Sequence, residues 1–464
     1  MKPEVCDLLV IGAGPAGIAA AVTARAQGLS VIVLDEQPRA GGQIWRDVGV
    51  ASQALMGLLG PDYAVGRTGV KALQDSGARV IHDCLVWDID AEGIVSALQA
   101  DRVLQFQPNE LLIATGATER ASPLPGWTLP GVINAGAAQI ALKSSGSVPE
   151  GRIALVGCGP LMLLLAGQLA RAGVRELTLV DTTPEGAFAR GWPHVAGALR
   201  HPKLLLKGLG LIRALRTAGV RWIRGASDVA VLGESRAQGI RFRAHRREQM
   251  LEADWVLLHH GVVPNTQLTR LLRLEHTWDA LQKAWHVRSD AWGATSLKGV
   301  RVAGDGTAIA GARAAELSGA LAALGAAHAQ GRLDDRQRDA LARPLRSELQ
   351  RERGARPFLD ALYAPPAWIT QPADEVIVCR CEEVSAGRIR EMARLGCEGP
   401  NQTKFFSRCG MGPCQGRVCG PVVTQVLAQA LGRDPQQVGA YRIRAPIKPI
   451  PLRALASLAQ DDTN

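Results

Sequence analysis

Residues 7–46 constrain the fold of this chain more than any other stretch. An apolar run at 8–11 leads into Gly12-Ala-Gly-Pro-Ala-Gly17, and an alanine-rich segment that predicts a helix follows. A second apolar run then ends on Asp35. Short apolar runs are typical of buried parallel strands, and the order strand, glycine turn, helix, strand, acid is typical of a dinucleotide-binding unit. The sequence therefore predicts an α/β protein with such a unit near its start.

Each residue of this first unit has a physical task. Gly12 permits the tight turn, Gly14 lets the backbone approach a pyrophosphate, and Gly17 lets the helix pack closely on the strand. The helix N-terminus offers free N–H groups and the positive end of its dipole to the phosphates. Asp35 lies where an acid accepts hydrogen bonds from ribose hydroxyls. The alternative is a doubly wound fold without a ligand. We assign to this site Gly12, Gly14, Pro15, Ala16, Gly17, Asp35 and Glu36.

The length and composition of the chain limit its class. With 464 residues it is long enough for two or three domains. It contains no run of about 18 apolar residues that would predict a membrane span. The first strand begins without room for a signal peptide, so we expect a cytoplasmic protein. The net charge of +10 comes from dispersed arginines without an aromatic–basic stripe, which favours solvated faces or subunit contacts over nucleic acid.

Three later motifs extend the first unit. Gly42-Gln43 lies in a glycine loop that can bring backbone close to a flavin, although alone it is only a turn. A strand ends in Thr115-Gly116, and a later strand ends in Gly304-Asp305 before an alanine-rich helix at 311–327. Together these motifs predict a return of the chain to the first sheet after a long excursion.

The excursion contains a second strand–turn–helix unit. Gly157 and Gly159 form its turn, and Asp181 ends its next strand. Met162 occupies the third glycine position, where a larger side chain prevents close helix–strand packing or shifts the helix outward. The predicted occupant is therefore NAD(P), ATP or nothing, the last being a retained fold with an empty site. No Cys-x-x-Cys lies in the excursion or before it, so a dithiol–disulfide reductase would lack its residues.

These motifs together resemble the flavoprotein family with two dinucleotide-binding domains that includes thioredoxin reductase. The resemblance implies two Rossmann-like domains, one inserted in the other, with FAD at the first site. It implies that Asp305 hydrogen-bonds the ribityl chain and that the following helix faces the isoalloxazine ring. The residues added to the FAD site on this basis are Gly42, Gln43, Thr115, Gly116, Gly304 and Asp305.

Six of the nine cysteines lie between Cys379 and Cys419. Such a cluster favours a metal site over disulfides. Soft thiolates suit an iron–sulfur cluster or zinc, and zinc is the alternative here. Cys379 and Cys381 are separated by one residue, which suits neighbouring bonds on one iron better than structural zinc. The glycines around Cys414 free backbone N–H groups for cluster sulfurs.

The cysteine pattern resembles bacterioferritin-associated ferredoxin, a small helical fold that holds a 2Fe–2S cluster. The match implies a cluster-binding domain with the ligands Cys379, Cys381, Cys414 and Cys419. The final spacing is longer here than in that ferredoxin, which leaves Cys409 as a competing ligand. We interpret Cys397 as a buried thiol outside the pattern.

The chain as a whole resembles one family, the alpha subunits of hetero-oligomeric amine and imino acid dehydrogenases. They include opine oxidases, D-hydroxyproline dehydrogenases and the cyanide-forming glycine dehydrogenase. The likeness includes Gly157-Cys-Gly-Pro-Leu, Val263-Pro-Asn-Thr and Gly410-Met-Gly-Pro-Cys. It implies an electron-handling oxidoreductase subunit with FAD and a 2Fe–2S cluster. A separate flavoprotein beta subunit would oxidise the substrate C–N bond. Further possibilities are an interface FMN and a small ferredoxin-like gamma subunit.

Two other functions stay open. One is a self-contained NAD(P)H-dependent flavin reductase that passes electrons to the cluster, and the other is a scaffold subunit. No motif places a histidine, carboxylate or arginine pair for hydride chemistry on an amino acid, so the catalytic residues are unassigned. We interpret the adjacent His259 and His260 as core or loop residues, because neighbours on a strand point to opposite faces.

The motifs divide the chain into segments. They are the FAD domain (1–135 and 266–330), the inserted nucleotide domain (136–265), a charged helix and proline-rich linker (331–373), the 2Fe–2S domain (374–440) and a tail (441–464). We expect the charged helix to break at Pro344. We expect the prolines at 357–372 to mark a linker that wraps around the molecule or spaces its domains, with a simple tether as the alternative. We expect the tail to be extended, with disorder as the alternative.

Overall fold

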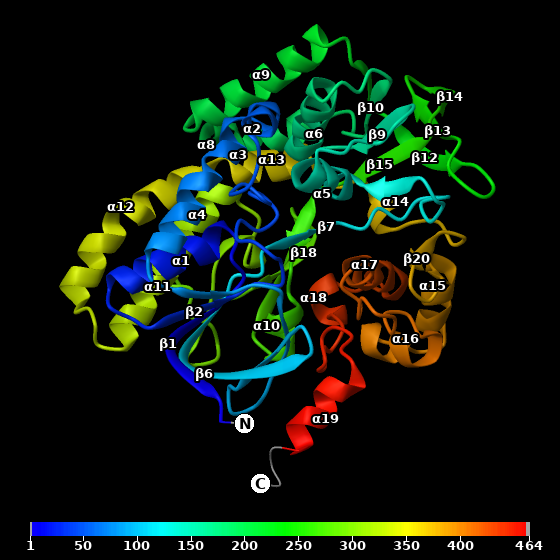
Figure 1. Ribbon diagram of the computed structural model, residues 1–464. Helices are drawn as coiled ribbons and strands as arrows, with labels where there is room; N and C mark the ends of the chain where they lie inside the picture. The colour runs from blue at the N-terminus through cyan, green and yellow to red at the C-terminus, as the bar shows by residue number, and fades with distance from the viewer. Residues whose placement is uncertain (1, 461–464) are drawn as a thin grey trace.

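The structure, a computed structural model, describes residues 2–460 of the chain. Two largely parallel sheets with helices against them form most of the molecule, and a group of short helices lies beside them (Figure 1). The second sheet is built between β6 (Arg102–Ile113) and β19 (Val300–Val302), which pair with each other in the first sheet. The structure thus confirms two Rossmann-like domains, one inserted in the other, and a helical C-terminal region.

The first sheet has seven strands in the order β3-β2-β1-β6-β5-β4, and β19 pairs with the C-terminal part of β6. The other strands are β1 (Glu4–Ile11), β2 (Val31–Leu34), β3 (Arg79–Ile81), β4 (Cys84–Ile89) and β5 (Val95–Gln99). β1 pairs in parallel with both β2 and β6. Leu8, Leu9 and Val10 are fully buried because both faces of the sheet are covered, which explains the apolar run.

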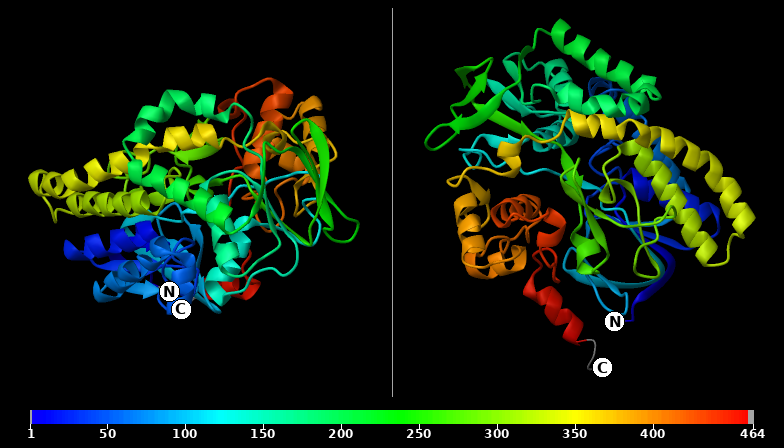
Figure 2. Two further views of the ribbon diagram at one scale, coloured as in Figure 1. Left: turned by 90° about the horizontal axis from the view of Figure 1, so that it is seen from above. Right: turned by 180° about the vertical axis from the view of Figure 1, so that it is seen from behind.

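Two helices of the first domain lie against each other over one face of the sheet, α1 (Pro15–Ala26) and α11 (Ala312–Ala329). A Cβ atom on Gly319 of α11 would lie 2.0 Å from the Ala16 carbonyl oxygen of α1, so only glycine permits this approach. α12 (Asp335–Gly354) then runs back beside α11, as both views in Figure 2 show.

The break predicted at Pro344 is wrong, because α12 continues through this residue. The ring of Trp292 lies between the guanidinium groups of Arg338 and Arg346, at 4.4 and 4.0 Å, on either side of the proline in sequence. Tertiary packing therefore holds together a helix that lacks one backbone donor.

The inserted domain has a five-stranded parallel sheet in the order β11-β10-β9-β15-β8. Its strands are β8 (Val132–Asn134), β9 (Ile153–Gly157), β10 (Leu177–Asp181), β11 (Arg221–Arg224) and β15 (Trp255–His259). An antiparallel sheet beside it contains β12 (Ser227–Leu232), β13 (Gly239–Ala244) and β14 (Arg247–Glu252). β8 lies just before residue 136, where we expected the insertion to begin.

The chain enters and leaves the inserted domain through two short strands that pair with each other. They are β7 (Ala117–Glu119) and β16 (Val262–Pro264), and a hairpin of β17 (His276–Asp279) and β18 (Ala284–Val287) follows. The helices of the two domains not yet named are α2 (Gln53–Leu59), α3 (Pro61–Ala64), α4 (Gly66–Asp75), α5 (Ala135–Ser145), α6 (Pro160–Arg171), α7 (Ala187–Gly191), α8 (Val195–Leu199), α9 (Pro202–Thr217) and α10 (Gln267–Leu271).

The proline-rich segment after α12 is not a simple spacer. It forms α13 (Arg356–Leu362) and α14 (Ala367–Thr370), and α13 packs against α7 of the inserted domain. Pro357 lies in the first turn of α13, where its missing N–H costs nothing. The prolines here begin helices rather than prevent them.

The C-terminal region contains β20 (Ile377–Cys379), β21 (Val384–Ser385), α15 (Ala386–Arg394), α16 (Pro400–Ser407), α17 (Gly420–Leu431) and α18 (Pro435–Val438). Trp127 of the inserted domain donates its indole N–H to the Ile377 carbonyl at 2.7 Å. Buried side chains of both sheets and of this region form one continuous core, so its position is fixed by packing.

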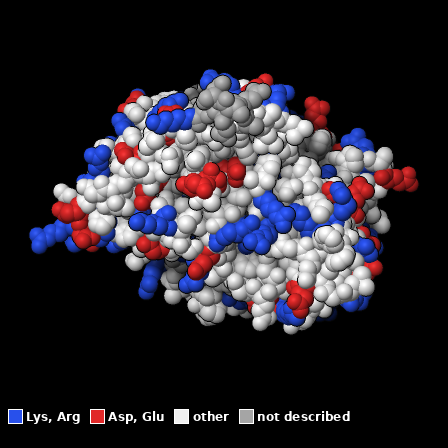
Figure 3. All heavy atoms as spheres, turned by 90° about the horizontal axis from the view of Figure 1, so that it is seen from below, with Lys and Arg blue, Asp and Glu red and all other residues white. Residues whose placement is uncertain are grey.

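The tail runs from the C-terminal region to the first sheet. Ile447 donates its backbone N–H to Trp87 of β4 at 2.9 Å, and α19 (Leu452–Gln460) follows. Only its first part matches the extended tail that we expected. No helix within residues 2–460 is long and apolar enough to cross a membrane. On the face drawn in Figure 3, basic side chains lie among acidic ones.

Candidate functional site

The residues predicted to bind FAD meet at the carboxyl end of the first sheet. Gly12 follows β1, Thr115 follows β6 and Gly304 follows β19, and parallel pairing of these strands brings their turns to one edge. A Cβ atom on Gly304 would lie 2.8 Å from the Cβ of Ala16. One on Gly42 would lie 2.8 Å from the Cα of Gly14. Four segments distant in sequence therefore surround one position.

The start of α1 has the features that a pyrophosphate requires. Gly14 precedes the helix, and no side chain caps the first-turn N–H groups. A Cβ atom on Gly17 would lie 1.8 Å from the Gly12 carbonyl oxygen, so a larger residue would push the helix off the strand. Because the N–H groups and the positive dipole end stay available, this site fits a dinucleotide.

The two acids after β2 have different surroundings. The Asp35 carboxylate accepts hydrogen bonds from the backbone N–H of Ala13 at 2.5 Å and of Gln37 at 2.7 Å, and burial raises its pKa. Asp35 thus fixes the glycine turn, while its bond to a ribose stays a prediction. Glu36 is partly exposed and forms an ion pair with Lys448 of the tail, a contact that the sequence did not predict.

Asp305 also binds backbone within its own turn. Its Oδ1 accepts the N–H groups of Ala310 at 2.9 Å and Gly311 at 3.0 Å, immediately before α11. Its Oδ2 makes no hydrogen bond to a residue of the described part of the chain. The carboxylate is therefore held in place with one oxygen left for a hydroxyl donor, which fits the ribityl bond that the resemblance implied.

Lys143 is a residue of this site that sequence reasoning missed. It belongs to α5 of the inserted domain and donates to the Gln43 carbonyl at 2.9 Å and to Gln139 Oε1 at 3.1 Å. Burial and the neighbouring Arg46 lower its pKa to about 7. An amine with this pKa lies against the loop that we assigned to the flavin. Its partner in the first domain is 100 residues away in sequence, so no local pattern reveals it.

The second nucleotide unit has the predicted shape and an uncapped helix start, but residues from other segments contact its acid and its turn. The Asp181 carboxylate accepts the Thr183 N–H at 2.9 Å and the Trp222 indole N–H at 3.2 Å. Cys158, between the two glycines of the turn, donates its thiol to the Tyr363 carbonyl at 3.6 Å. Met162 is buried in the core of the inserted domain. The acid is thus occupied within the protein, and the end of α13 contacts the turn.

His259 and His260 are core residues, as predicted. His259 Nδ1 lies 2.6 Å from Glu119 Oε1, and His260 Nδ1 lies 2.8 Å from the Ser122 hydroxyl. Burial lowers the pKa of His260 to about 3. The two rings have separate partners, so they do not form a joint metal site.

The cysteines of the C-terminal region gather in two neighbouring groups. The sulfurs of Cys379, Cys409 and Cys419 lie within 4.8 Å of one another and are buried. Cys381 is exposed and hydrogen-bonds with Cys414. The thiols of Cys409 and Cys419 donate to Cys379 and lower its pKa to about 2. The structure thus brings Cys409, the competing ligand, next to Cys379 and Cys419.

Cys397 is buried, as predicted, and does not belong to the buried group of three sulfurs. The Gly410 N–H donates to the Cys379 sulfur at 3.3 Å. Buried soft donors that already receive a backbone N–H fit an iron–sulfur cluster and also fit zinc.

Comparison with known proteins agrees with this arrangement. A family model described as pyridine nucleotide-disulphide oxidoreductase matches residues 6–331, and one described as the sarcosine oxidase A3 domain matches residues 375–459. The opine oxidase A subunit of Agrobacterium tumefaciens (strain Ach5) is 44% identical and covers 97% of this chain and 92% of its own length. The chain belongs to the family of opine oxidase A subunits.

More distant relatives share the same organisation. Hydrogen cyanide synthase subunit HcnB of Pseudomonas aeruginosa is 30% identical over 98% of this chain and 99% of its own length. Among solved structures, L-proline dehydrogenase from P. horikoshii superposes with a TM-score of 0.70 at 19% identity, over 98% of this chain and 80% of that chain. This likeness shows the fold. Family membership makes this opine oxidase A homologue an FAD-dependent oxidoreductase.

Proposed function

We propose that this chain is the electron-carrying subunit of a multi-subunit enzyme that oxidises the C–N bond of an opine. The observation that carries the proposal is the coexistence, in one continuous core, of a site that fits FAD and a buried group of cysteine thiols. The relatives are named as subunits of opine oxidase and hydrogen cyanide synthase. We infer a flavoprotein beta subunit that holds the substrate, with a small ferredoxin-like gamma subunit beside it in the cytoplasm.

The choice of an opine over other amino or imino acids rests on sequence identity. Three opine oxidase A subunits, from Agrobacterium tumefaciens and Rhizobium meliloti, are 41–44% identical to this chain, whereas the HcnB subunits are 30–31% identical. The coverage of the chain is nearly complete in both groups. Opines are therefore the first substrates to test, and D-hydroxyproline and glycine are the next.

For the cysteine site we propose a 2Fe–2S cluster. Such a cluster needs two pairs of thiolates, one pair for each iron. The spacing suggested that Cys379 and Cys381 share one iron, but the fold instead offers Cys379 with Cys419 and Cys381 with Cys414 as two neighbouring pairs. When bound, FAD would supply two-electron chemistry and the cluster one-electron chemistry, which connects substrate oxidation to a one-electron acceptor. The chain's own part is to hold both groups at fixed positions.

The test of the substrate uses the chain purified with its co-encoded partners under anaerobic conditions. We expect the flavin absorbance to fade on addition of octopine or nopaline, and a one-electron dye to be reduced in turn. Fading with D-hydroxyproline or glycine alone would reject the opine assignment. Absence of fading with every amino and imino acid would favour a scaffold role.

The test of the cluster is chemical analysis of iron, acid-labile sulfide and zinc in the same preparation. We expect iron and sulfide in equal amounts, with loss of both in Cys419→Ser. Cys397→Ser is the matched control, because Cys397 is also buried but lies outside the buried group of sulfurs. Zinc without sulfide would contradict the proposal.

The NAD(P)H-dependent reductase is the second candidate. The glycine turn of the second unit supports it, since Gly157 and Gly159 both adopt positive φ angles. The contact of Tyr363 with the turn and the packing of Met162 at the third glycine position weigh against it. Fading of the flavin with NADH alone would make it the better account.

A further inference from the structure

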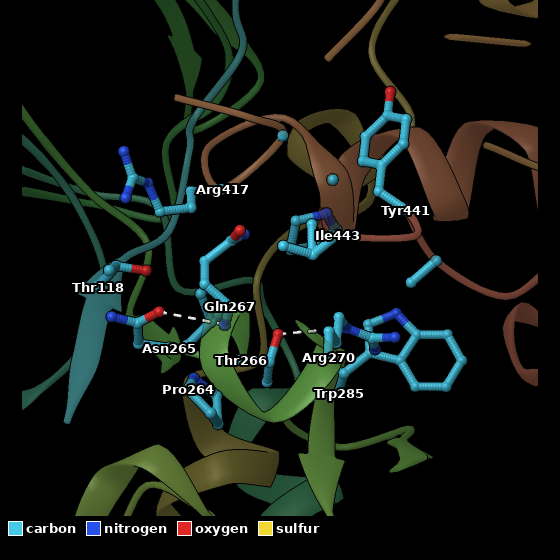
Figure 4. Close-up of a pocket in the computed structure, with 15 residues that line it drawn as sticks. Thr118, Pro264, Asn265, Thr266, Gln267, Arg270, Trp285, Arg417, Tyr441 and Ile443 are labelled. Carbon is cyan, nitrogen blue, oxygen red and sulfur yellow. Dashed lines mark hydrogen bonds between the residues drawn. The ribbon is translucent and has the colours of Figure 1, made fainter. Parts of the chain in front are cut away.

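A cavity separates the flavin-binding part of the molecule from the C-terminal region. The cavity and the solvent space at its open mouth together comprise about 450 Å³. One wall comes from β16, α10 and β18, and the other from the start of α17 and the first residues of the tail. Figure 4 shows Gln267 reaching toward its centre and Arg270 lying beside Trp285. None of the predicted cofactor residues lines it.

Three buried polar atoms on the first of these walls have no hydrogen-bond partner. They are Oε1 of Gln267, Nη2 of Arg270 and Nε1 of Trp285. Gln267 and Trp285 are each only 7% exposed as whole residues. Buried polar atoms in proteins almost always have a hydrogen-bond partner. Three unpaired polar atoms on one wall of a cavity therefore indicate that a bound ligand supplies the missing hydrogen bonds.

Arg270 gives the cavity its charge. Its Nε donates to the Thr266 hydroxyl at 3.3 Å, and its guanidinium lies 4.8 Å from the centre of the Trp285 ring. No Asp or Glu lines the cavity, and Arg270 forms no salt bridge within the described part of the chain. Burial lowers the pKa of Arg270 to about 10, which still leaves it charged near neutral pH. A buried cation without a counter-ion favours an anionic ligand.

The unpaired donors and acceptor define the chemical class of the ligand further. The Arg270 and Trp285 N–H groups are donors, which suit the two oxygens of a carboxylate. The Gln267 carbonyl oxygen is an acceptor, which suits an amine or imine N–H. We propose that this cavity binds a small carboxylate that also carries an N–H group, of the amino or imino acid class. The site belongs to this chain alone and does not depend on the redox role proposed above.

The walls of the cavity connect it with both redox sites. Asn265 lines it and donates its backbone N–H to the Gly116 carbonyl at 3.0 Å, beside the predicted flavin. Tyr441 also lines it, and this side chain lies next to the thiol of Cys409. A ligand here would thus lie between the predicted flavin site and the group of buried cysteines.

The test is calorimetric titration of the purified full chain, without partners, with four probes. They are octopine and L-proline, which carry both groups, pyruvate, which lacks the N–H, and inorganic phosphate. We expect octopine or L-proline to bind, with pyruvate at least tenfold weaker. Failure of both amino acid probes to bind, or tighter binding of phosphate, would overturn the proposal.

Variants of the chain locate the binding. Arg270→Met should weaken binding of the amino acid probe at least tenfold, and Arg270→Lys should weaken it less. Gln267→Leu should weaken the amino acid probe but leave pyruvate unchanged. Arg213→Met, at an exposed position on α9, is the matched control. Unchanged binding in both Arg270→Lys and Gln267→Leu would reject the site, even if Arg270→Met fails to fold.

Discussion

The first and second nucleotide units show how one motif can have two outcomes. In the first, Gly17 brings α1 within contact of the β1 turn, and Asp35 binds the backbone N–H groups of Ala13 and Gln37. In the second, Met162 stands at the matching place, Trp222 binds the acid and Tyr363 contacts the turn. The strand–turn–helix frame is common to both. Both helix starts also lack a side-chain cap, and both acids accept two hydrogen bonds. What differs is that Trp222 and Tyr363, which lie outside the motif, contact the second unit.

The largest effect on FAD binding and stability should come from substitutions at the third glycine position of each unit, Gly17 and Met162. Gly17→Ala places a Cβ atom 1.8 Å from the Gly12 carbonyl oxygen, so we expect loss of FAD and a fall of about 3 kcal/mol in the free energy of unfolding. Met162→Ala should lose about 3 kcal/mol as a cavity mutation but retain FAD. Flavin content and urea unfolding measure both.

Gly57→Ala on α2 is the control for these two variants, because a Cβ atom there has no neighbour within 4 Å. It should retain both FAD and stability. Full FAD occupancy in Gly17→Ala would contradict the conclusion that close helix–strand packing at Gly17 is needed for FAD binding.

The two acids provide the next test. Asp35→Ala removes the acceptor of two backbone N–H groups in the first turn, and each lost bond to a charged acceptor is worth about 2 kcal/mol. We therefore expect the Kd for FAD of the stripped protein to rise at least tenfold. Asp181→Ala should leave that Kd unchanged. Equal effects of the two substitutions would show that the units are not distinct in function.

Lys143 links the two domains by a hydrogen bond, and its lowered pKa predicts how the stability of the protein changes with pH. Its pKa of about 7 in the folded protein lies below the ordinary value of 10.5, so the unfolded chain binds more protons between these two values. Stability should therefore rise with pH from about 7 upward, by about 2 kcal/mol between pH 7 and 9. In Lys143→Met this rise should disappear, as measured by urea unfolding at both pH values. An unchanged rise would assign the effect to another group.

The smallest effect should come from Trp222→Phe, which removes the indole N–H bond to Asp181. The loss of one hydrogen bond at a half-buried site is worth about 1 kcal/mol. Flavin content should stay the same, and weak nucleotide binding to the second unit should become measurable by equilibrium dialysis with NAD. A loss of flavin in this variant would mean that the second unit supports the first.

Local sequence patterns predicted the parts of the molecule that local geometry determines. The glycine turn at the start of α1 is one such part. It was predicted from Gly12 and Gly17, which are five residues apart, together with the acid after the next strand. The Gly304-Asp305 turn predicted that the chain returns to the first sheet, and the fold shows that it does so by pairing β19 with β6. The continuation of α12 through Pro344 could not be predicted, because Trp292 supports it from outside the helix.

The same reasoning explains which site residues were missed. Lys143 and Arg270 carry no motif, and their importance comes from burial next to partners supplied by other segments. Cys409 was recognised as a competing ligand, but only the fold brings its sulfur to Cys379 and Cys419. Tyr363 lies in a segment that we expected to be a spacer, and α13 carries it to the second unit.

The most direct test of this account is an anaerobic titration of the purified chain with NADH, followed by octopine in the presence of its partner subunits. We predict that the flavin absorbance is unchanged by NADH and fades with octopine only when the partner is present. Rapid fading of the isolated chain with NADH would contradict the account, because the second unit would then be a working nucleotide site.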